Sequence, residues 1–432
     1  MLHPILDSDS RAGHSSAPNV EAGSALDWLI SPFGRQSFFN SYWEQRPLVV
    51  NRDQPDYFSR LLSLKEVDRV LTTLGRRYPD VTLKNASRPV SEEDYTVGDG
   101  ALDVAKVYQL FAEGSTITLA FLDTVVPDLT LFCRRLESEF SFPFQANIYL
   151  TPPHAQGAKP HYDTHDVFVL QAEGSKEWTL FGTPLALPLP GQDFDPAVHD
   201  KGPSTLQFRL NAGDVAYLPR GVIHEACSTG TVSLHITVGI LRYTWADLLL
   251  EFVAGACLQD PAFRKALPPS FAQSDFARAP ARETLRDLLQ QVWDKSNFDR
   301  ALDRFVDEFI AACPPILEGQ LAQMAALNDL SIDSVAGARP GVICRLDEDA
   351  DFVRLDCYGR KITLPSYAHK AIRFAVTNPR YVVRDLPGNL DDAGKLTLLH
   401  RLIREGLVIM FANSPSQGDD PGPAATLTPR HG

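Results

Sequence analysis

Three residues have the types and the spacing of a metal site: His161 and Asp163, two positions apart, and His224 further along the chain. In an extended strand the side chains of residues i and i+2 point to the same side, so His161 and Asp163 can both face the inside of a barrel. The segment GDVAYLPRGVIHEA has a Gly-Asp turn, a short strand and a Pro turn that can bring His224 to that side. Two imidazoles and one carboxylate are the facial triad of non-haem Fe(II) oxygenases, which leaves coordination positions open.

A His-x-Asp pair by itself carries little information. His161 and Asp163 could form a surface pair, and His224 could be a hydrogen-bonded histidine of the core. Both segments resemble strands, however, and the Pro turn stands just before His224, which favours the metal site. In a 2-oxoglutarate-dependent enzyme the keto acid would fill two open positions and O₂ the third, which a site closed by four ligands does not allow. We therefore predict an Fe(II) site.

The segment that contains these residues predicts a small all-β barrel or jelly roll. Between Phe144 and Leu241, short β-rich runs alternate with Gly, Pro and Asp, which is typical of such folds. Residues 24–60 have an amphipathic pattern that predicts helices, and residues beyond Thr244 carry apolar side chains at helical spacing. The runs expected to be strands are ANIYL, DVFVLQ, EWTLF, STLQFRL, DVAYLP and SLHITVGIL.

These patterns predict an α+β protein of several domains, as a chain of 432 residues requires. The catalytic barrel and its flanking helices occupy residues 24–244, a helical region follows at 245–330, and a winged-helix-like module of mixed elements follows at 331–412. Residues 1–23 lack the basic and apolar regions of a secretory signal and are expected to be a flexible leader. The polar, Pro- and Gly-rich residues 413–432 are expected to be a disordered tail.

The composition restricts the partners. The net charge is −13, and residues 331–412 contain 12 Lys and Arg against 10 Asp and Glu, so we expect no direct DNA binding. The six cysteines are scattered without a CxxC pair, which argues against a zinc ribbon or a disulfide framework and favours a reducing cytoplasm. No apolar run approaches the roughly 18 residues of a membrane span, so we expect no membrane association. The scattered aromatics, such as Trp178 and Trp245, are expected to be core residues.

Four segments together resemble one known family, the JmjC-type oxygenases with a cupin fold (a double-stranded β-helix), and within it the ribosomal-oxygenase branch. These segments are FFNSYWEQRPLVV, PHYDTHDVFVLQAEGSKEWTLF, GDVAYLPRGVIHEA and SLHITVG, and the mixed C-terminal module also matches in order. The resemblance extends from about Leu26 to Phe411. It implies Fe(II) and 2-oxoglutarate as cofactor and co-substrate, and a homodimer formed through the helical region, although the same apolar positions could be intramolecular core.

The resemblance also implies roles for residues around the triad. A lysine at the position of Lys176 pairs with the distal carboxylate of 2-oxoglutarate in the family, whereas a solvated lysine at a hairpin tip is the simpler alternative. Asn147 and Tyr149 match positions that line the co-substrate and substrate pocket. Gly239 stands where relatives often carry a hydroxyl, so Thr237 or Ser233 would have to replace that contact. His165 could face the same cavity, whereas Asp166 points the other way; His154 and His235 are expected to be structural.

The leading functional hypothesis is therefore hydroxylation of a protein or peptide side chain, with release of succinate and CO₂. The resemblance suggests a histidine or an arginine of a ribosomal protein as the target. Two alternatives remain open, because a fold does not determine a function. One is hydroxylation of a small molecule or a natural-product peptide, and the other is a non-catalytic, metal-binding cupin module.

Overall fold

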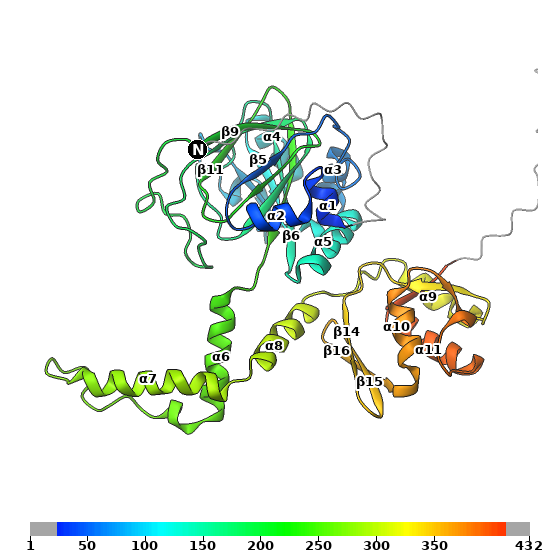
Figure 1. Ribbon diagram of the computed structural model, residues 1–432. Helices are drawn as coiled ribbons and strands as arrows, with labels where there is room; N and C mark the ends of the chain where they lie inside the picture. Colours follow the sequence, from blue (N-terminus) through cyan, green and yellow to red (C-terminus); the bar gives the residue numbers. More distant parts are fainter. Residues whose placement is uncertain (1–23, 412–432) are drawn as a thin grey trace, which may run out of the picture. The chain divides into compact units, whose positions relative to one another are not determined.

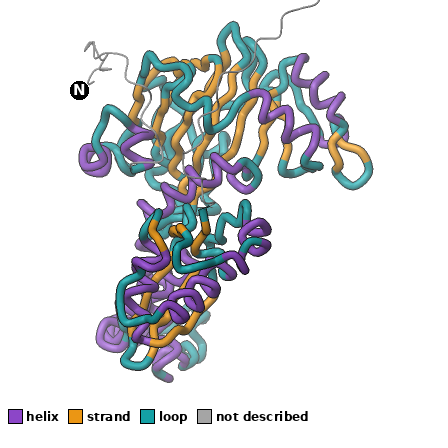
Figure 2. Tube along the Cα trace, turned by 90° about the vertical axis from the view of Figure 1, so that its right-hand side faces the viewer, coloured by secondary structure: helices purple, strands orange, loops and turns teal. Residues whose placement is uncertain are grey.

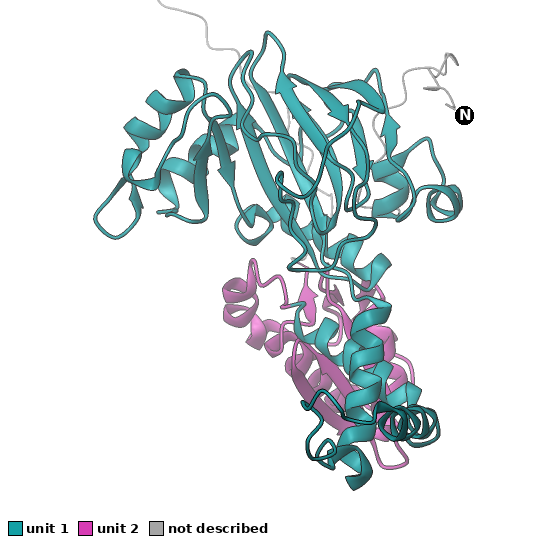
Figure 3. Cartoon of the chain, turned by 90° about the vertical axis from the view of Figure 1, so that its left-hand side faces the viewer, with its two compact units in different colours: residues 1–313 teal, residues 314–432 magenta. Residues whose placement is uncertain are grey.

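The computed structural model describes residues 24–411, so the expected leader (1–23) and tail (413–432) lie outside the described residues. The chain forms two compact units, Met1–Cys313 and Pro314–Gly432 (Figure 3). The helical region expected at 245–330 is thus divided between them. Within the described residues no helix is both long and apolar enough to cross a bilayer, and all six cysteines are free thiols.

The core of the first unit is a pair of sheets that face each other (Figures 1 and 2). A seven-stranded sheet has the order β1-β10-β7-β12-β6-β5-β2, and a three-stranded sheet has the order β11-β8-β9. Apolar side chains from β7 and β10 pack against those from β8 and β9, so the two sheets enclose one core. The strands are β1 (Leu48–Val50), β2 (Val81–Lys84), β5 (Thr116–Leu119), β6 (Phe144–Thr151), β7 (Asp166–Glu173), β8 (Ser175–Leu180), β9 (Leu206–Asn211), β10 (Val215–Leu218), β11 (His224–Ser228) and β12 (Ser233–Ile240).

The six runs expected to be strands between Phe144 and Leu241 are all strands, which confirms the double-stranded β-helix. One helical prediction is wrong. Within residues 24–60, Leu48–Val50 is strand β1, which pairs with β10 and so extends the large sheet. The segment is amphipathic over most of its length, and this pattern hid a three-residue strand whose apolar side chains are buried by β10.

Helices cover one side of the large sheet. Ser24 and Ser63 accept backbone N–H groups at the starts of α1 and α3, as good N-cap residues do. Pro127 starts α5 at the first helical position, where its missing N–H costs nothing. These helices are α1 (Ala25–Ile30), α2 (Arg35–Ser41), α3 (Leu64–Thr73), α4 (Val104–Ala112) and α5 (Pro127–Phe140), with a two-stranded ribbon of β3 (Thr96–Val97) and β4 (Ala101–Leu102).

Three further helices follow the barrel: α6 (Trp245–Gln259), α7 (Arg278–Lys295) and α8 (Phe298–Ala311). Thr244 and Asp247 form a capping box that starts α6. The helices share only a small buried cluster, in which Phe252 and Val292 are the largest side chains. Trp245 is 76% exposed, so its assignment to the core was wrong. A Trp at the first position of a capped helix points away from the small cluster.

The second unit has its own core. Two three-stranded sheets, β17-β13-β18 and β14-β15-β16, pack with α10 and α11 around buried aliphatic side chains. Its elements are α9 (Gln320–Ala325), β13 (Val335–Ala338), β14 (Cys344–Glu348), β15 (Phe352–Cys357), β16 (Arg360–Pro365), α10 (His369–Thr377), β17 (Tyr381–Val382), α11 (Asp392–Arg404) and β18 (Val408–Met410).

Candidate metal centre

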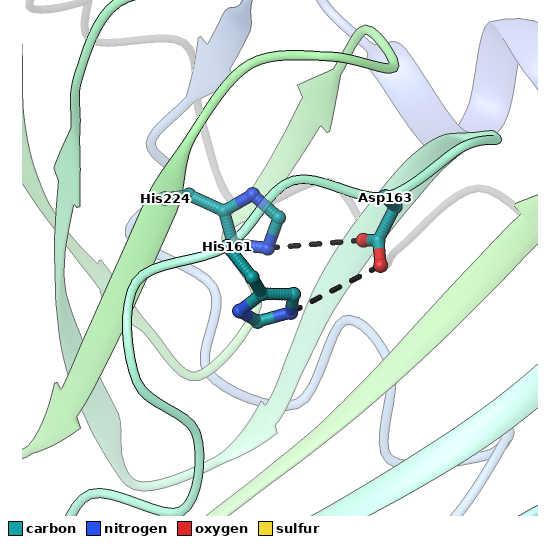
Figure 4. Close-up of side chains that lie close together, drawn as sticks. All are labelled: His161, Asp163 and His224. Atoms are coloured by element: carbon teal, nitrogen blue, oxygen red, sulfur yellow. Dashed lines mark ion pairs between the residues drawn. The ribbon is translucent and has the colours of Figure 1, made fainter. Parts of the chain in front are cut away.

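The structure brings His161, Asp163 and His224 together (Figure 4). Their ligand atoms all lie within 4.8 Å of one another. The Nε2 atom of His224 is 3.7 Å from Oδ2 of Asp163, and Nε2 of His161 is 4.0 Å from Oδ1 of Asp163. One carboxylate and two imidazole nitrogens therefore converge on one point, which is the donor set of a facial triad.

Backbone hydrogen bonds hold the two ligand segments in register. The N–H of His161 donates to the carbonyl of His224, and the N–H of His224 donates back to the carbonyl of His161. Gly221 donates its N–H to the carbonyl of Asp163. The first two ligands were expected within a strand, but they lie in the extended segment before β7, which begins only at Asp166. This single bridge is the physical reason that a segment outside the sheet still places both ligands.

Both histidines present the same ring nitrogen. Nδ1 of His161 lies 2.8 Å from the carbonyl oxygen of Lys159, and Nδ1 of His224 lies 3.0 Å from that of Val222. A proton on each Nδ1 would satisfy these carbonyls and leave each Nε2 lone pair free for a metal. Burial lowers the pKa of His224, which favours the neutral imidazole that a metal requires.

A buried ion pair lies behind the ligand segments. Asp166 is fully buried and accepts from the guanidinium of Arg220 at 2.6 Å and from the hydroxyl of Tyr217 at 2.9 Å. Arg220 also reaches Glu44 at 2.6 Å, next to the start of β1. Asp166 is thus held by Arg220 and Tyr217 and is not part of the group formed by His161, Asp163 and His224. Since Asp166 follows Asp163 by three residues and Arg220 precedes His224 by four, the pair joins the two segments that carry the ligands.

Replacement of Arg220 by methionine is expected to lower the free energy of unfolding by about 3–5 kcal/mol, because it leaves the Asp166 carboxylate buried without its cation. Chemical denaturation of the wild-type and variant proteins measures this difference. Arg209→Ala is the matched control: its pair with Glu177 is exposed on both sides, so a change of at most about 1 kcal/mol is expected. Equal effects of the two substitutions would contradict this role of the buried pair.

A small cavity of about 100 Å³ adjoins the three ligands. Lys176 lines it and is 4% exposed, so the alternative of a solvated lysine is wrong. Its Nζ lies 3.4 Å from Nδ1 of His235, and among the described residues it has no carboxylate partner. Burial lowers the pKa of Lys176 from 10.5 to about 7, and burial together with the nearby Lys176 charge lowers that of His235 further below its usual range. A buried ammonium of this kind requires an anion to hold its charge.

Further polar atoms at this cavity lack partners within residues 24–411. The hydroxyl of Thr118 and the indole N–H of Trp178 are buried without a hydrogen bond, although buried polar groups are normally satisfied. Together with Lys176 they form a set of donors that fits a small carboxylate. Trp178 lies two residues after Lys176 on β8, so its place on the same face follows from a local spacing that was not used. Thr118 and His235 come from other strands, and their approach to Lys176 depends on long-range pairing.

Of the other residues predicted to line the pocket, some lie at the cavity and others do not. Tyr149 and Thr237 line the cavity, and the Tyr149 ring stacks on His235 with centroids 4.9 Å apart. Asn147 pairs with Thr237 across β6 and β12, but its Oδ1 accepts the N–H of Phe121 and it is not part of the cavity lining. Ser233 is buried at the far end of β12, where it accepts from Gln171, so only Thr237 could replace a hydroxyl at position 239.

Gly239 makes room for His165. A Cβ atom at position 239 would lie 2.8 Å from Cδ2 and 2.9 Å from Nε2 of His165, closer than real contacts allow. Gly239 shares a face of β12 with Thr237 and pairs with Gln145 of β6, so this layer lies next to the cavity. The His165 ring therefore occupies the space that a side chain at position 239 would need.

Gly239→Ala is expected to destabilise the fold by about 1–3 kcal/mol, because the added methyl group must displace the His165 ring. Thermal unfolding would show a lowered midpoint. The same substitution in a His165→Ala background is the control, and there the penalty should largely disappear. If the cost were the same in both backgrounds, the contact with His165 would not be its cause.

Comparisons with known proteins identify relatives of the domain that carries these residues. A family model for the JmjC domain matches residues 124–248. The bifunctional lysine-specific demethylase and histidyl-hydroxylase NO66 of Dictyostelium discoideum is 32% identical over 333 residues, which are 72% of this chain and 64% of that protein. Ribosomal oxygenase 1 of Danio rerio is 30% identical over 327 residues, which are 69% of this chain and 58% of that protein.

The chain thus spans less than two thirds of the length of these curated relatives. Among solved structures, YcfD, a ribosomal oxygenase from Escherichia coli in complex with cobalt and 2-oxoglutarate, is similar with a TM-score of 0.50. The match covers 88% of this chain and 98% of that chain at 17% identity, and it concerns the fold. Residues 124–248 therefore form a JmjC domain of the cupin fold, and the chain is similar to the ribosomal oxygenases among the JmjC proteins.

Proposed function

We propose that this chain is an Fe(II)- and 2-oxoglutarate-dependent oxygenase that hydroxylates a side chain of a protein or peptide. The observation that carries the proposal is the combination of two features at one cavity. His161, Asp163 and His224 converge there with their ligand atoms, and Lys176 lies buried beside them without an anionic partner. A non-catalytic metal site has no need of both.

The residues present fit the metal and the keto acid. His161, Asp163 and His224 would hold Fe(II), and Lys176, with the donors of Thr118 and Trp178, would hold the distal carboxylate of 2-oxoglutarate. When bound, Fe(II) and the keto acid supply O₂ activation, with succinate and CO₂ as products. Tyr149 and Thr237 would line the co-substrate pocket, and Asn147 would act only through the strand that it shares with Tyr149.

Two apolar side chains form part of the cavity wall. Val167 and Val169 of β7 are buried and line the cavity beside Thr237, which pairs with Val169 across β12 and β7. An apolar wall lowers the local polarity and so strengthens the attraction between Lys176 and a carboxylate. Because the cavity is small, the oxidised group would be a single side chain that enters from outside.

The substrate that we propose is a histidine or an arginine of a ribosomal protein, since the relatives carry the names ribosomal oxygenase and histidyl-hydroxylase. To test it, purified ribosomal proteins would be incubated with the chain, Fe(II), 2-oxoglutarate and O₂, and then digested and analysed by mass spectrometry. One peptide that gains one oxygen atom, in step with succinate formation, is expected. Succinate without any such peptide would instead favour a small molecule as substrate.

The proposed assembly is a homodimer formed through α6 and α7. Trp245, Leu250 and Leu258 on α6 and Trp293 on α7 are all largely exposed, which is unusual for an apolar surface of this extent. Sedimentation of a monomer at micromolar concentration would exclude such a dimer.

For residues 331–412 we propose a winged-helix-like module that does not bind DNA directly. The cytoplasmic location remains the expectation from the scattered free cysteines.

A further inference from the structure

A second and larger cavity, a groove of about 700 Å³, opens next to the metal cavity. The two share four lining residues: Lys84, Gly157, Ala158 and His161. Since His161 is one of the three ligands, a chain that lies in the groove can reach the metal cavity without a break. We call this feature the lysine groove, after Lys84, Lys159 and Lys201 in its lining.

The three lysines come from three different segments. Lys84 ends β2, Lys159 lies between β6 and β7, and Lys201 lies between β8 and β9. All three are exposed, and no ion pair involves them anywhere in residues 24–411. Lys201 instead places its ammonium 4.5 Å from the centroid of the Phe181 ring. Free positive charge thus gathers at the groove although the chain as a whole carries −13.

The lining contains two other charged side chains, Arg88 and Asp200. Arg88 pairs with Glu113 at 2.7 Å. Asp200 is the one acidic residue of the lining; its Oδ1 accepts the N–H of Gly202, and the carboxylate keeps its charge. The three lysines outnumber this carboxylate, so the groove keeps a positive character and attracts negative charge by long-range electrostatics.

The walls between the lysines suit a polypeptide rather than a nucleic acid. Proline and aliphatic side chains form a large part of them, and Phe194 is already stacked on His199 with centroids 5.7 Å apart. Proteins that bind single-stranded nucleic acid offer free aromatic faces and long basic tracks, and the groove has neither. The apolar residues of the lining are Leu83, Ala86, Pro89, Val90, Ala158, Pro160, Phe194 and Pro196.

We propose that the lysine groove binds an acidic stretch of the polypeptide substrate, next to the residue that enters the metal cavity. The proposal rests on the proposed function, because it assigns a sequence preference to that substrate. Two or three carboxylates at spacings that match Lys84, Lys159 and Lys201 would fix the register of the peptide. The target side chain would then be selected by its acidic neighbours as well as by its own type.

The test measures peptide binding by the full chain, without metal, by fluorescence anisotropy at low salt. The probes are labelled hexaglutamate, hexalysine and a single-stranded RNA hexamer. We expect hexaglutamate to bind best and added salt to weaken it. The triple variant Lys84→Glu, Lys159→Glu, Lys201→Glu should weaken hexaglutamate binding about tenfold or more, since it reverses three contacts. A Lys65→Glu, Lys106→Glu, Lys265→Glu variant, with the same charge change at exposed lysines outside the groove, should lose far less.

Equal losses in the two triple variants, or no binding of hexaglutamate by the wild type, would overturn the proposal. Tighter, groove-dependent binding of the RNA hexamer would overturn it in favour of a nucleic-acid partner. Circular dichroism of each variant excludes misfolding as the cause. Because the binding assay needs neither metal nor turnover, the outcomes separate: groove-dependent binding with no succinate formation would reject the proposed function alone, and succinate formation without such binding would reject the groove alone.

Discussion

Asp163→Ala is expected to abolish both Fe(II) binding and turnover of 2-oxoglutarate. Asp163 supplies the one carboxylate of the triad, and both imidazoles lie within 4.0 Å of it. Loss of a group that only orients a metal ligand already costs about 10–100-fold, so loss of the ligand itself should cost more than about 100-fold in activity. His161→Ala should behave in the same way. Calorimetric titration with Fe(II) under nitrogen, followed by a succinate assay, measures both effects.

Asp193→Ala is the matched control for this prediction. Asp193 is an exposed aspartate in the segment between β8 and β9, and it does not line the metal cavity. It should keep metal affinity and activity within about twofold of the wild type, as surface substitutions usually do. Full activity of the Asp163 variant would show that the triad is assigned to the wrong residues.

Lys176→Met is expected to raise the 2-oxoglutarate concentration needed for half-maximal activity by about 10- to 100-fold, and to leave Fe(II) binding intact. The substitution removes a hydrogen bond between charged groups, which is worth about 1.5–3 kcal/mol. Methionine fills a similar volume, so the cavity should not collapse. Steady-state assays over a range of 2-oxoglutarate concentrations, together with Fe(II) titration, separate the two effects.

The same substitution has a predictable effect on stability without co-substrate. Burial lowers the pKa of Lys176 from 10.5 to about 7. Between these values the unfolded chain binds more protons than the folded chain, so the contribution of Lys176 to stability rises with pH from about 7 to 10.5. Below pH 7 its full cost, on the order of a few kcal/mol, is present. Lys176→Met should therefore unfold at a higher temperature than the wild type at pH 7, and the difference should shrink towards pH 10. A lower midpoint at pH 7 would mean that the lysine already has a partner.

The three candidate metal ligands were found in the sequence from local signals. The two-residue spacing of His161 and Asp163 and the Pro turn before His224 indicated one shared side, although the first two residues lie before β7 and not within a strand. The six strands between Phe144 and Leu241 were predictable for the same reason, since alternation and turn residues are local signals. The family resemblance added Lys176, which the spacing alone left open.

The parts that escaped prediction depend on contacts between distant segments. Strand β1 pairs with β10, and although two of its three residues are valines, so short a run did not stand out from the helical pattern around it. Thr118 becomes a cavity donor only when β5 approaches β8, the strand that carries Lys176 and Trp178. The exposure of Trp245 escaped prediction for a related reason, because an apolar helix face gives the same pattern whether it meets its own chain or another.

The most direct test of the central claim is anaerobic addition of Fe(II) and then 2-oxoglutarate to the purified chain, followed by visible absorption. A keto acid that chelates Fe(II) at an open facial triad should give a weak charge-transfer band, which should decay on admission of O₂ as succinate appears. The Lys176→Met variant should need more 2-oxoglutarate to reach the same band. No band and no succinate, with Fe(II) shown to be bound, would contradict the oxygenase assignment and favour a metal-binding module without this chemistry.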